Sequence, residues 1–103
     1  MKPRFLILKS ASHRIEQIYD YSVENWGVAQ ANKYIEGLFD LFERISNNSV
    51  LWKTIPAEFE VSGYYTRYEQ HFVFWKELSD GRVGFAAVLH DRMNLEERLK
   101  DEF

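Results

Sequence analysis

The sequence predicts an α+β fold with the element order β-α-α-β-β-β-α, in a single domain of residues 1–103. Apolar residues recur at helical spacing between Ala11 and Ile45, and aromatic and β-branched residues then dominate from Tyr64 to His90. A run of helices followed by a run of strands is typical of a domain whose helices are segregated to one face of a sheet. We therefore expect an N-terminal helical hairpin packed on one face of an antiparallel sheet, followed by a short C-terminal helix.

The first strand is predicted at residues 4–9, where the apolar run Phe5-Leu6-Ile7-Leu8 indicates burial on both faces. Ser10 or Ser12 can cap the helix that follows, because a serine oxygen accepts a hydrogen bond from the first backbone N–H groups of a helix. Gly27 suits the left-handed position that ends this helix. The apolar stripe of this first helix consists of Ala11, Ile15, Ile18, Tyr19, Ser22 and Trp26.

A second helix is predicted from Val28 to Ile45. Only Gly27 separates the two helices, so they should form an antiparallel hairpin. Gly37 inside the second helix costs about 1 kcal/mol relative to alanine. Either another backbone approaches this glycine closely, or the helix tolerates the cost. The apolar stripe of this helix consists of Ala31, Tyr34, Ile35, Leu38, Leu41, Phe42 and Ile45, with Phe39 beside it.

Residues 46–49, Ser-Asn-Asn-Ser, close the second helix and begin a loop. We expect residues 50–62 to form an irregular linker that holds no more than one short turn. The segments that follow are rich in aromatic and β-branched residues and predict strands at Tyr64–Glu69, His71–Leu78 and Arg82–His90. The tight turn Ser79-Asp80-Gly81 makes the last two strands antiparallel.

A short C-terminal helix is predicted at Leu95–Glu102, because Asn94 and Glu97 have the spacing of a capping box. Acidic residues in its first turn, followed by Arg98 and Lys100, match the helix dipole.

The composition supports one modest core, since the 103 residues are 46% hydrophobic and 17% aromatic. This core is predicted to lie between the hairpin and the sheet and to contain Phe5, Ile7, Ile15, Ile18, Leu38, Phe42, Val73, Val83, Phe85 and Val88.

The composition also narrows the classes of function. The chain has no cysteine, which excludes a disulfide scaffold, a thiolate nucleophile and a cysteine-based metal site. The apolar run near the N-terminus is too short for a signal or membrane segment, so we expect a cytoplasmic location. The net charge of −3 argues against direct binding of nucleic acid, because proteins that bind it unaided are usually basic.

The residues that could carry chemistry are few. His71 and His90 could exchange protons near neutral pH, but ring packing in the sheet with one hydrogen bond is the simpler interpretation. His13 lies on an exposed helix face and is expected to be inert. The histidines are dispersed without metal-binding spacing, so we predict no metal, no cofactor and no catalytic residue.

Three motifs, in order along about residues 5–99, resemble those of the RelE/ParE superfamily of small bacterial toxins, and within it the ParE branch. The first is Trp26-Gly27 followed by Gln30-Ala31 and Tyr34. The second is the strand segment His71-Phe72-Val73-Phe74. The third, Val88-Leu89-His90-Asp91-Arg92-Met93-Asn94, is similar to a closing Ile-Leu-His-x-x-Met-Asp segment. Where the family usually has Gly-x-Arg, this chain has Gly63-Tyr64-Tyr65, with Arg67 two residues later.

The resemblance implies the toxin of a type II toxin–antitoxin pair. It implies inhibition of DNA gyrase, through the A subunit, and neutralisation by a ParD-like antitoxin. The alternative within the superfamily is a ribosome-dependent mRNA endonuclease of the RelE type, which would use Arg67, Lys53, Arg92 and His90. The tyrosine that RelE-type members carry near the C-terminus is missing, since no tyrosine follows Tyr68. A third possibility is an inactive toxin-like protein that only binds an antitoxin.

Two sets of binding residues are predicted. The target should contact the region where the strand ends meet the C-terminal helix, because cations and aromatic residues converge there in an otherwise acidic chain. This set contains Arg67, Tyr68, His90, Arg92 and Met93. The antitoxin should be anchored by exposed aromatic residues of the hairpin and the sheet, namely Tyr21, Trp26, Phe39, Tyr65 and Trp75.

Overall fold

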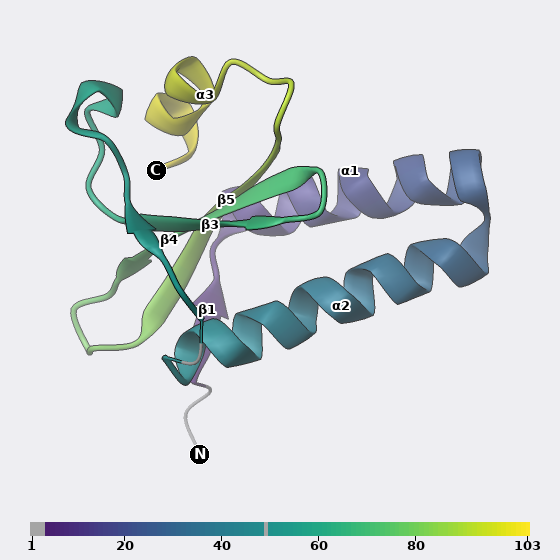
Figure 1. Cartoon of the computed structure of the whole chain (residues 1–103), viewed down its shortest axis with the longest axis horizontal. Helices are drawn as coiled ribbons and strands as arrows, with labels where there is room; N and C mark the ends of the chain where they lie inside the picture. The colour runs from purple at the N-terminus through teal and green to yellow at the C-terminus, as the bar shows by residue number, and fades with distance from the viewer. Residues whose placement is uncertain (1–3, 49) are drawn as a thin grey trace.

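The computed structural model describes residues 4–48 and 50–103. Its helices and main strands follow the predicted order, and one short strand is added before the main strands. The single short turn expected within residues 50–62 is a 3-10 helix. The elements are β1 (Phe5–Ile7), α1 (Lys9–Trp26), α2 (Val28–Ser46), β2 (Lys53–Thr54), η1 (Ala57–Phe59), β3 (Tyr64–Tyr68), β4 (His71–Glu77), β5 (Val83–His90) and α3 (Leu95–Glu102) (Figure 1). Within the described ranges, no helix has the length and apolar character needed to cross a bilayer.

The strands form one sheet in the order β1-β5-β4-β3-β2. The pairs β3–β4 and β4–β5 are antiparallel, as predicted, but β1 pairs with β5 in parallel, so the sheet is mixed. The apolar pattern of a strand does not reveal the direction of its partner, which is why the sequence did not show this pairing. Lys53 and Thr54 form an edge strand against β3 where an irregular linker was expected.

The two helices form the predicted antiparallel hairpin, whose Gly27 end projects beyond the sheet (Figure 1). Gly27 has a φ of 89°, a backbone conformation that costs glycine little, and this explains why the chain reverses there. The predicted serine cap is wrong. α1 begins at Lys9, with Leu8 at the N-cap, two residues before Ser10. The hydroxyl of Ser10 instead donates to the carbonyl oxygens of Ala86 and Glu102 and so links α1 to β5 and α3.

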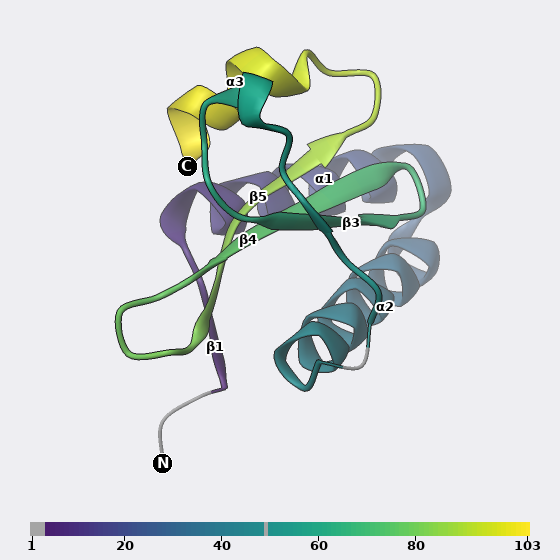
Figure 2. The ribbon, with the colours of Figure 1, turned by 60° about the vertical axis from the view of Figure 1, so that its left-hand side comes forward.

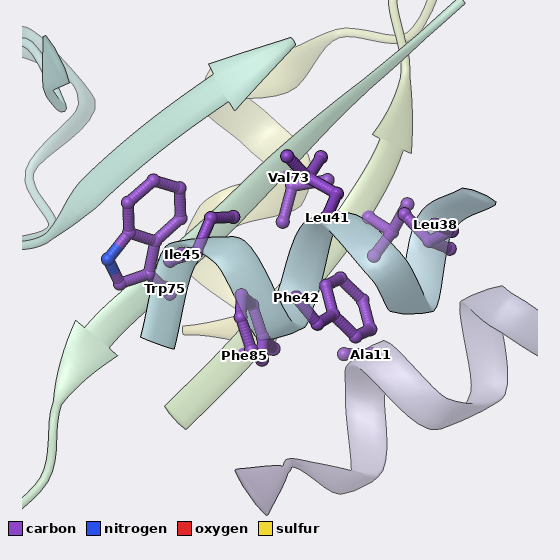
Figure 3. Close-up of a cluster of buried hydrophobic side chains, with 9 residues drawn as sticks. Ala11, Leu38, Leu41, Phe42, Ile45, Val73, Trp75 and Phe85 are labelled. Carbon is purple, nitrogen blue, oxygen red and sulfur yellow. The ribbon is translucent and has the colours of Figure 1, made fainter. Parts of the chain in front are cut away.

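Apolar residues fill both faces of the sheet. The predicted core residues pack in one cluster between the hairpin and the sheet, with Leu38, Phe42, Val73, Phe85 and Val88 buried and the others packed against them (Figure 3). A second cluster, which the sequence did not predict, lies on the opposite face beneath α3. It contains Ile55, Phe74, Ala87, Leu89 and Leu99. The sheet therefore lies between the helical hairpin and α3 (Figure 2).

A β-bulge between β4 and β5 sets the inward-facing residues of the core. Trp75 pairs with Phe85, whereas the preceding Phe74 pairs with Ala87. Ala86 is thereby left as the extra residue, which allows Phe85 and Val88 to face the hairpin although they are three positions apart. Strict alternation would place these two residues on opposite faces.

Gly37 is explained by a side chain, which neither sequence-based interpretation included. A β-carbon at this position would overlap the hydroxyl of Tyr68. That hydroxyl donates to the carbonyl oxygen of Tyr34 at 2.8 Å, and the two tyrosine rings pack edge to face. The absence of a side chain at Gly37 therefore lets β3 dock on α2 through Tyr68.

α3 begins as predicted. The side chain of Asn94 accepts a hydrogen bond from the backbone N–H of Glu97 at 3.2 Å. This cap fixes the start of the helix directly after the turn that follows β5, and so it helps to position Arg92 and Met93.

Candidate partner-binding groove

A groove opens between the projecting half of the hairpin and the end of the sheet at which β5 terminates. Its volume is about 760 Å³. One wall comes from α1 and α2, the floor from β4 and β5, and the other wall from the turns at the ends of these strands. The lining residues are Arg14, Gln17, Ile18, Tyr21, Ser22, Trp26, Gln30, Tyr34, Gln70, His71, Val88, His90, Arg92 and Met93.

Helical periodicity builds the α1 wall, because residues three and four positions apart lie on one face of a helix. Near the Gly27 end of this wall, the rings of Tyr21 and Trp26 meet edge to face with centroids 5.7 Å apart. These two side chains are 59% and 62% exposed. Exposed aromatic side chains of this kind often contribute most of the binding energy at protein interfaces.

A tyrosine–histidine pair forms part of the floor. The hydroxyl of Tyr34 lies 2.6 Å from Nδ1 of His71. Burial, followed by the nearby His90, lowers the pKa of His71 to about 4. Burial is also the main reason why the pKa of Tyr34 is raised to about 12. At neutral pH both side chains are therefore uncharged, and the phenol hydroxyl and Nδ1 share one hydrogen bond.

Acid should destabilise the protein through His71. The pKa of this side chain is about 4 in the folded protein, against 6.5 for an ordinary histidine. The unfolded chain therefore takes up the proton first as the pH falls. The stabilisation is complete above pH 6.5 and is lost progressively toward pH 4. Because the ring is only partly buried, we expect a contribution of about 1–2 kcal/mol, less than the full shift implies.

Denaturant melts of the wild type and of His71→Gln, at about pH 7 and about pH 4.5, measure this contribution. The variant should lose less stability than the wild type between the two pH values. Equal losses would contradict the assignment of a proton-sensitive role to His71.

The turn after β5 is held by Asp91. One carboxylate oxygen lies 2.7 Å from the guanidinium of Arg67, and the other lies 3.2 Å from Nδ1 of His90. The backbone N–H of Arg92 donates to the same Nδ1 at 3.1 Å. The guanidinium of Arg92 makes no ion pair with any described residue. It is exposed at the rim of the groove, available to a partner.

Comparison with known proteins identifies the family. The protein-family model described as the ParE toxin of type II toxin–antitoxin systems, parDE, matches residues 5–95. The chain belongs to the ParE toxin family. It is 27% identical to Toxin ParE1 of Mycobacterium tuberculosis (strain H37Rv) over 101 residues, which cover 96% of this chain and 100% of that protein. It is 28% identical to Toxin ParE of Escherichia coli over 97 residues, which cover 94% of this chain and 93% of that protein.

Membership in the family confirms the resemblance seen in the sequence and implies an antitoxin partner. In this ParE-family toxin, the groove brings together residues from both predicted binding sets. Tyr21 and Trp26, expected to hold the antitoxin, share it with His90, Arg92 and Met93, expected to contact the target. Trp26 and His90 are more than sixty residues apart in the sequence, so their proximity depends on the fold.

None of the five remaining predicted residues lines the groove. Phe39 is 38% exposed on α2 and packs edge to face on Phe42. Tyr65 packs against the second apolar cluster, on the sheet face beneath α3. Tyr68 turns toward α2, where its hydroxyl is bonded within the protein. Arg67 is connected to the groove through Asp91.

The prediction that Trp75 is an exposed anchor is wrong. Its side chain is only 5% exposed and belongs to the core between hairpin and sheet (Figure 3). The alternation of β4 places Trp75 on the same face as Val73, toward α2, and the bulge pairs it with Phe85. It cannot contact a partner without opening the fold.

Of the residues suggested for an endonuclease, Arg67, His90 and Arg92 lie together at the turn after β5, whereas Lys53 lies apart from them. Lys53 pairs with Tyr65, in a row that continues to Phe74 on the sheet face beneath α3. His90 lines the groove on the opposite face, at the far end of β5. A proton-transfer pair and the cation that stabilises the phosphate must converge on one reacting group. Lys53 and His90 do not meet that requirement.

Arg14 and Tyr34 line the groove but were absent from both predicted sets. Periodicity could have indicated Arg14, which lies four residues before Ile18 and thus on the same face of α1. Tyr34 was placed in the apolar stripe of α2, and its contact with His71 depends on how β4 docks on the hairpin. That docking is a tertiary property with no signal in the local sequence.

Proposed function

We propose that this ParE-family toxin inhibits DNA gyrase, by binding its A subunit, and thereby blocks replication in the cytoplasm. We further propose that a ParD-like antitoxin neutralises it by folding a segment into the groove. The groove itself supports the proposal best: it combines the exposed rings of Tyr21 and Trp26 with the cation of Arg92, which has no ion-pair partner among the described residues. A segment that folds on binding needs apolar anchors of this kind, because ordering it costs free energy.

Three observations favour binding over catalysis by the toxin itself. Lys53 and His90 lie on opposite faces of the sheet. The sequence has no tyrosine after Tyr68 to act as the C-terminal tyrosine of RelE-type members does. The net charge of −3 also argues against direct binding of RNA by this chain.

Induction of the toxin in cells tests this proposal against its alternatives. A gyrase inhibitor should give filamentous cells and DNA-damage signalling. A ribosome-dependent endonuclease should instead cause rapid loss of translation with no early DNA-damage signal. A protein that only binds its antitoxin should give neither response, and that result would overturn the proposed target.

Trp26→Ala should weaken binding of the antitoxin, the product of the adjoining gene. An aromatic residue at the centre of an interface contributes about 2 kcal/mol or more, so Kd should rise roughly thirtyfold. Isothermal calorimetry measures the change. Phe39→Ala is the matched control, because Phe39 is also an exposed aromatic residue of the hairpin but lies outside the groove.

Equal losses for Trp26→Ala and Phe39→Ala would place the antitoxin over the outer side of the helices. A wild-type toxin that shows no heat of binding at all would contradict the proposed partner.

A further inference from the structure

Two histidines lie side by side in the groove floor. His71 of β4 is directly opposite His90 of β5 in the sheet register, and their ring centroids are 5.2 Å apart. Both side chains line the groove. Which nitrogen of each ring carries the proton decides what the floor offers to a partner, and the neighbours of each ring determine this.

In His71 we assign the proton to Nε2. The hydroxyl of Tyr34 lies 2.6 Å from Nδ1, and if this hydroxyl donates to Nδ1, an uncharged imidazole carries its one proton on the other nitrogen. The lowered pKa of His71 and the raised pKa of Tyr34 mean that both side chains are uncharged at neutral pH.

In His90, different contacts also place a proton on Nε2. When this ring is uncharged, Nδ1 accepts the backbone N–H of Arg92, and the proton again lies on Nε2. When the ring is protonated, Nδ1–H donates to Asp91, whose other oxygen is held by Arg67, and Nε2 keeps its proton as well. In both states Nε2–H remains a donor. Within residues 4–48 and 50–103, no acceptor bonds Nε2 of either ring.

The charged side chains that line the groove are all basic. Among the described residues that line the groove are two arginines, Arg14 and Arg92, and no aspartate or glutamate. This is notable in a chain with 16 acidic residues. Asp91 is close, but its carboxylate is held by Arg67 and faces Nδ1 of His90. The floor therefore offers N–H donors beside a cation, whereas Ile18, Trp26 and Met93 supply apolar contact. An amphipathic peptide with acidic side chains complements this combination.

We propose that the Nε2–H groups of His71 and His90, together with the guanidinium of Arg92, form a carboxylate-binding site that receives an aspartate or glutamate side chain of the docked antitoxin segment. The inference rests on the proposed docking of an antitoxin in this groove and specifies what the groove recognises. The apolar wall supplies affinity, and the carboxylate site fixes the register of the segment, because charge-assisted hydrogen bonds add geometric specificity.

The tautomers are tested first, on the full-length toxin alone. Long-range proton–nitrogen spectra of toxin labelled with 15N-histidine at neutral pH should show Nε2 protonated in both His71 and His90. A ring with its proton on Nδ1 and none on Nε2 would overturn the site, whether or not any antitoxin binds.

Calorimetry with the purified product of the adjoining gene then tests recognition. His90→Phe keeps a ring but removes the donor, so Kd should rise roughly tenfold or more, as expected for loss of a hydrogen bond to a charged group. His90→Gln carries an amide N–H at a similar reach and should retain most of the affinity. Replacing the acidic residues of the antitoxin one at a time by their amides should identify one whose effect disappears in the His90→Phe background.

The outcomes separate this inference from the proposed function. If wild-type toxin does not bind the antitoxin, the proposed partner fails. If it binds, but His90→Phe and His90→Gln lose affinity equally or not at all, the carboxylate site fails while the partner stands. Histidine signals that shift with a short oligonucleotide and not with the antitoxin would assign the floor to phosphate and also overturn the proposal.

Discussion

Leu38→Ala should lower the free energy of unfolding by about 2–5 kcal/mol, the range for leucine-to-alanine changes at fully buried sites. Leu38 is 0% exposed and points from α2 into the core that joins the hairpin to the sheet (Figure 3). Truncating it removes apolar contacts and leaves a cavity. The neighbouring aromatic rings cannot fill that cavity, because Phe42 is already stacked on Phe85 with centroids 4.1 Å apart.

Denaturant melts measure this change. Glu36→Ala, on the exposed side of the same helix, is the control and should alter stability by no more than about 0.5 kcal/mol. A near-zero effect of Leu38→Ala would mean that α2 presents a different face to the sheet, and the groove built on that helix would then be misplaced.

Glu102→Gln should cost about 2–4 kcal/mol of stability, because it leaves the cation of Arg14 mostly buried without its counter-charge. The two side chains are 18% and 11% exposed. Their guanidinium and carboxylate groups meet through two hydrogen bonds, each 3.0 Å long. The pair fastens the end of α3 to α1. Arg14 also lines the groove, so the same variant should weaken antitoxin binding.

A second ion pair on α3 provides the control. Lys100 lies 3.0 Å from Glu60, but both side chains are well exposed. Lys100→Met should therefore leave the unfolding midpoint almost unchanged. The double variant Arg14→Met with Glu102→Met should recover much of the stability lost in Glu102→Gln, since no unpaired charge remains. A Glu102→Gln variant as stable as Lys100→Met would show that the Arg14–Glu102 pair is not a structural link.

Local sequence patterns were sufficient for most of the fold. The apolar stripes of α1 and α2, the glycine between them and the Asn94 cap are signals carried by residues close together in the chain. What they could not supply was information from distant residues. The parallel pairing of β1 with β5, the short strand β2 and the second apolar cluster all depend on which segments meet after the chain has folded.

In the candidate site, too, the sequence was sufficient for some residues, whereas the roles of others depend on contacts between distant parts of the chain. Tyr21, Trp26, Arg92 and Met93 were chosen from the sequence for their chemistry, and the structure places them around one groove. Trp75 was chosen by the same reasoning and is buried, because an aromatic residue in a strand looks alike whether it faces a core or a partner. The roles of Tyr34 and Arg14 arise from contacts with His71 and Glu102, far from them in the chain.

The most direct test of the proposed function is a cleavage assay with purified gyrase, supercoiled DNA and purified toxin. The toxin should stabilise gyrase–DNA cleavage complexes and should leave ribosome-bound mRNA intact. Arg92→Ala should weaken the poisoning while the variant remains folded, because Arg92 is an exposed cation at the rim of the groove. Cleavage of mRNA in a reconstituted ribosome, abolished by Arg92→Ala or His90→Ala and accompanied by no effect on gyrase, would contradict the proposal and establish the endonuclease alternative.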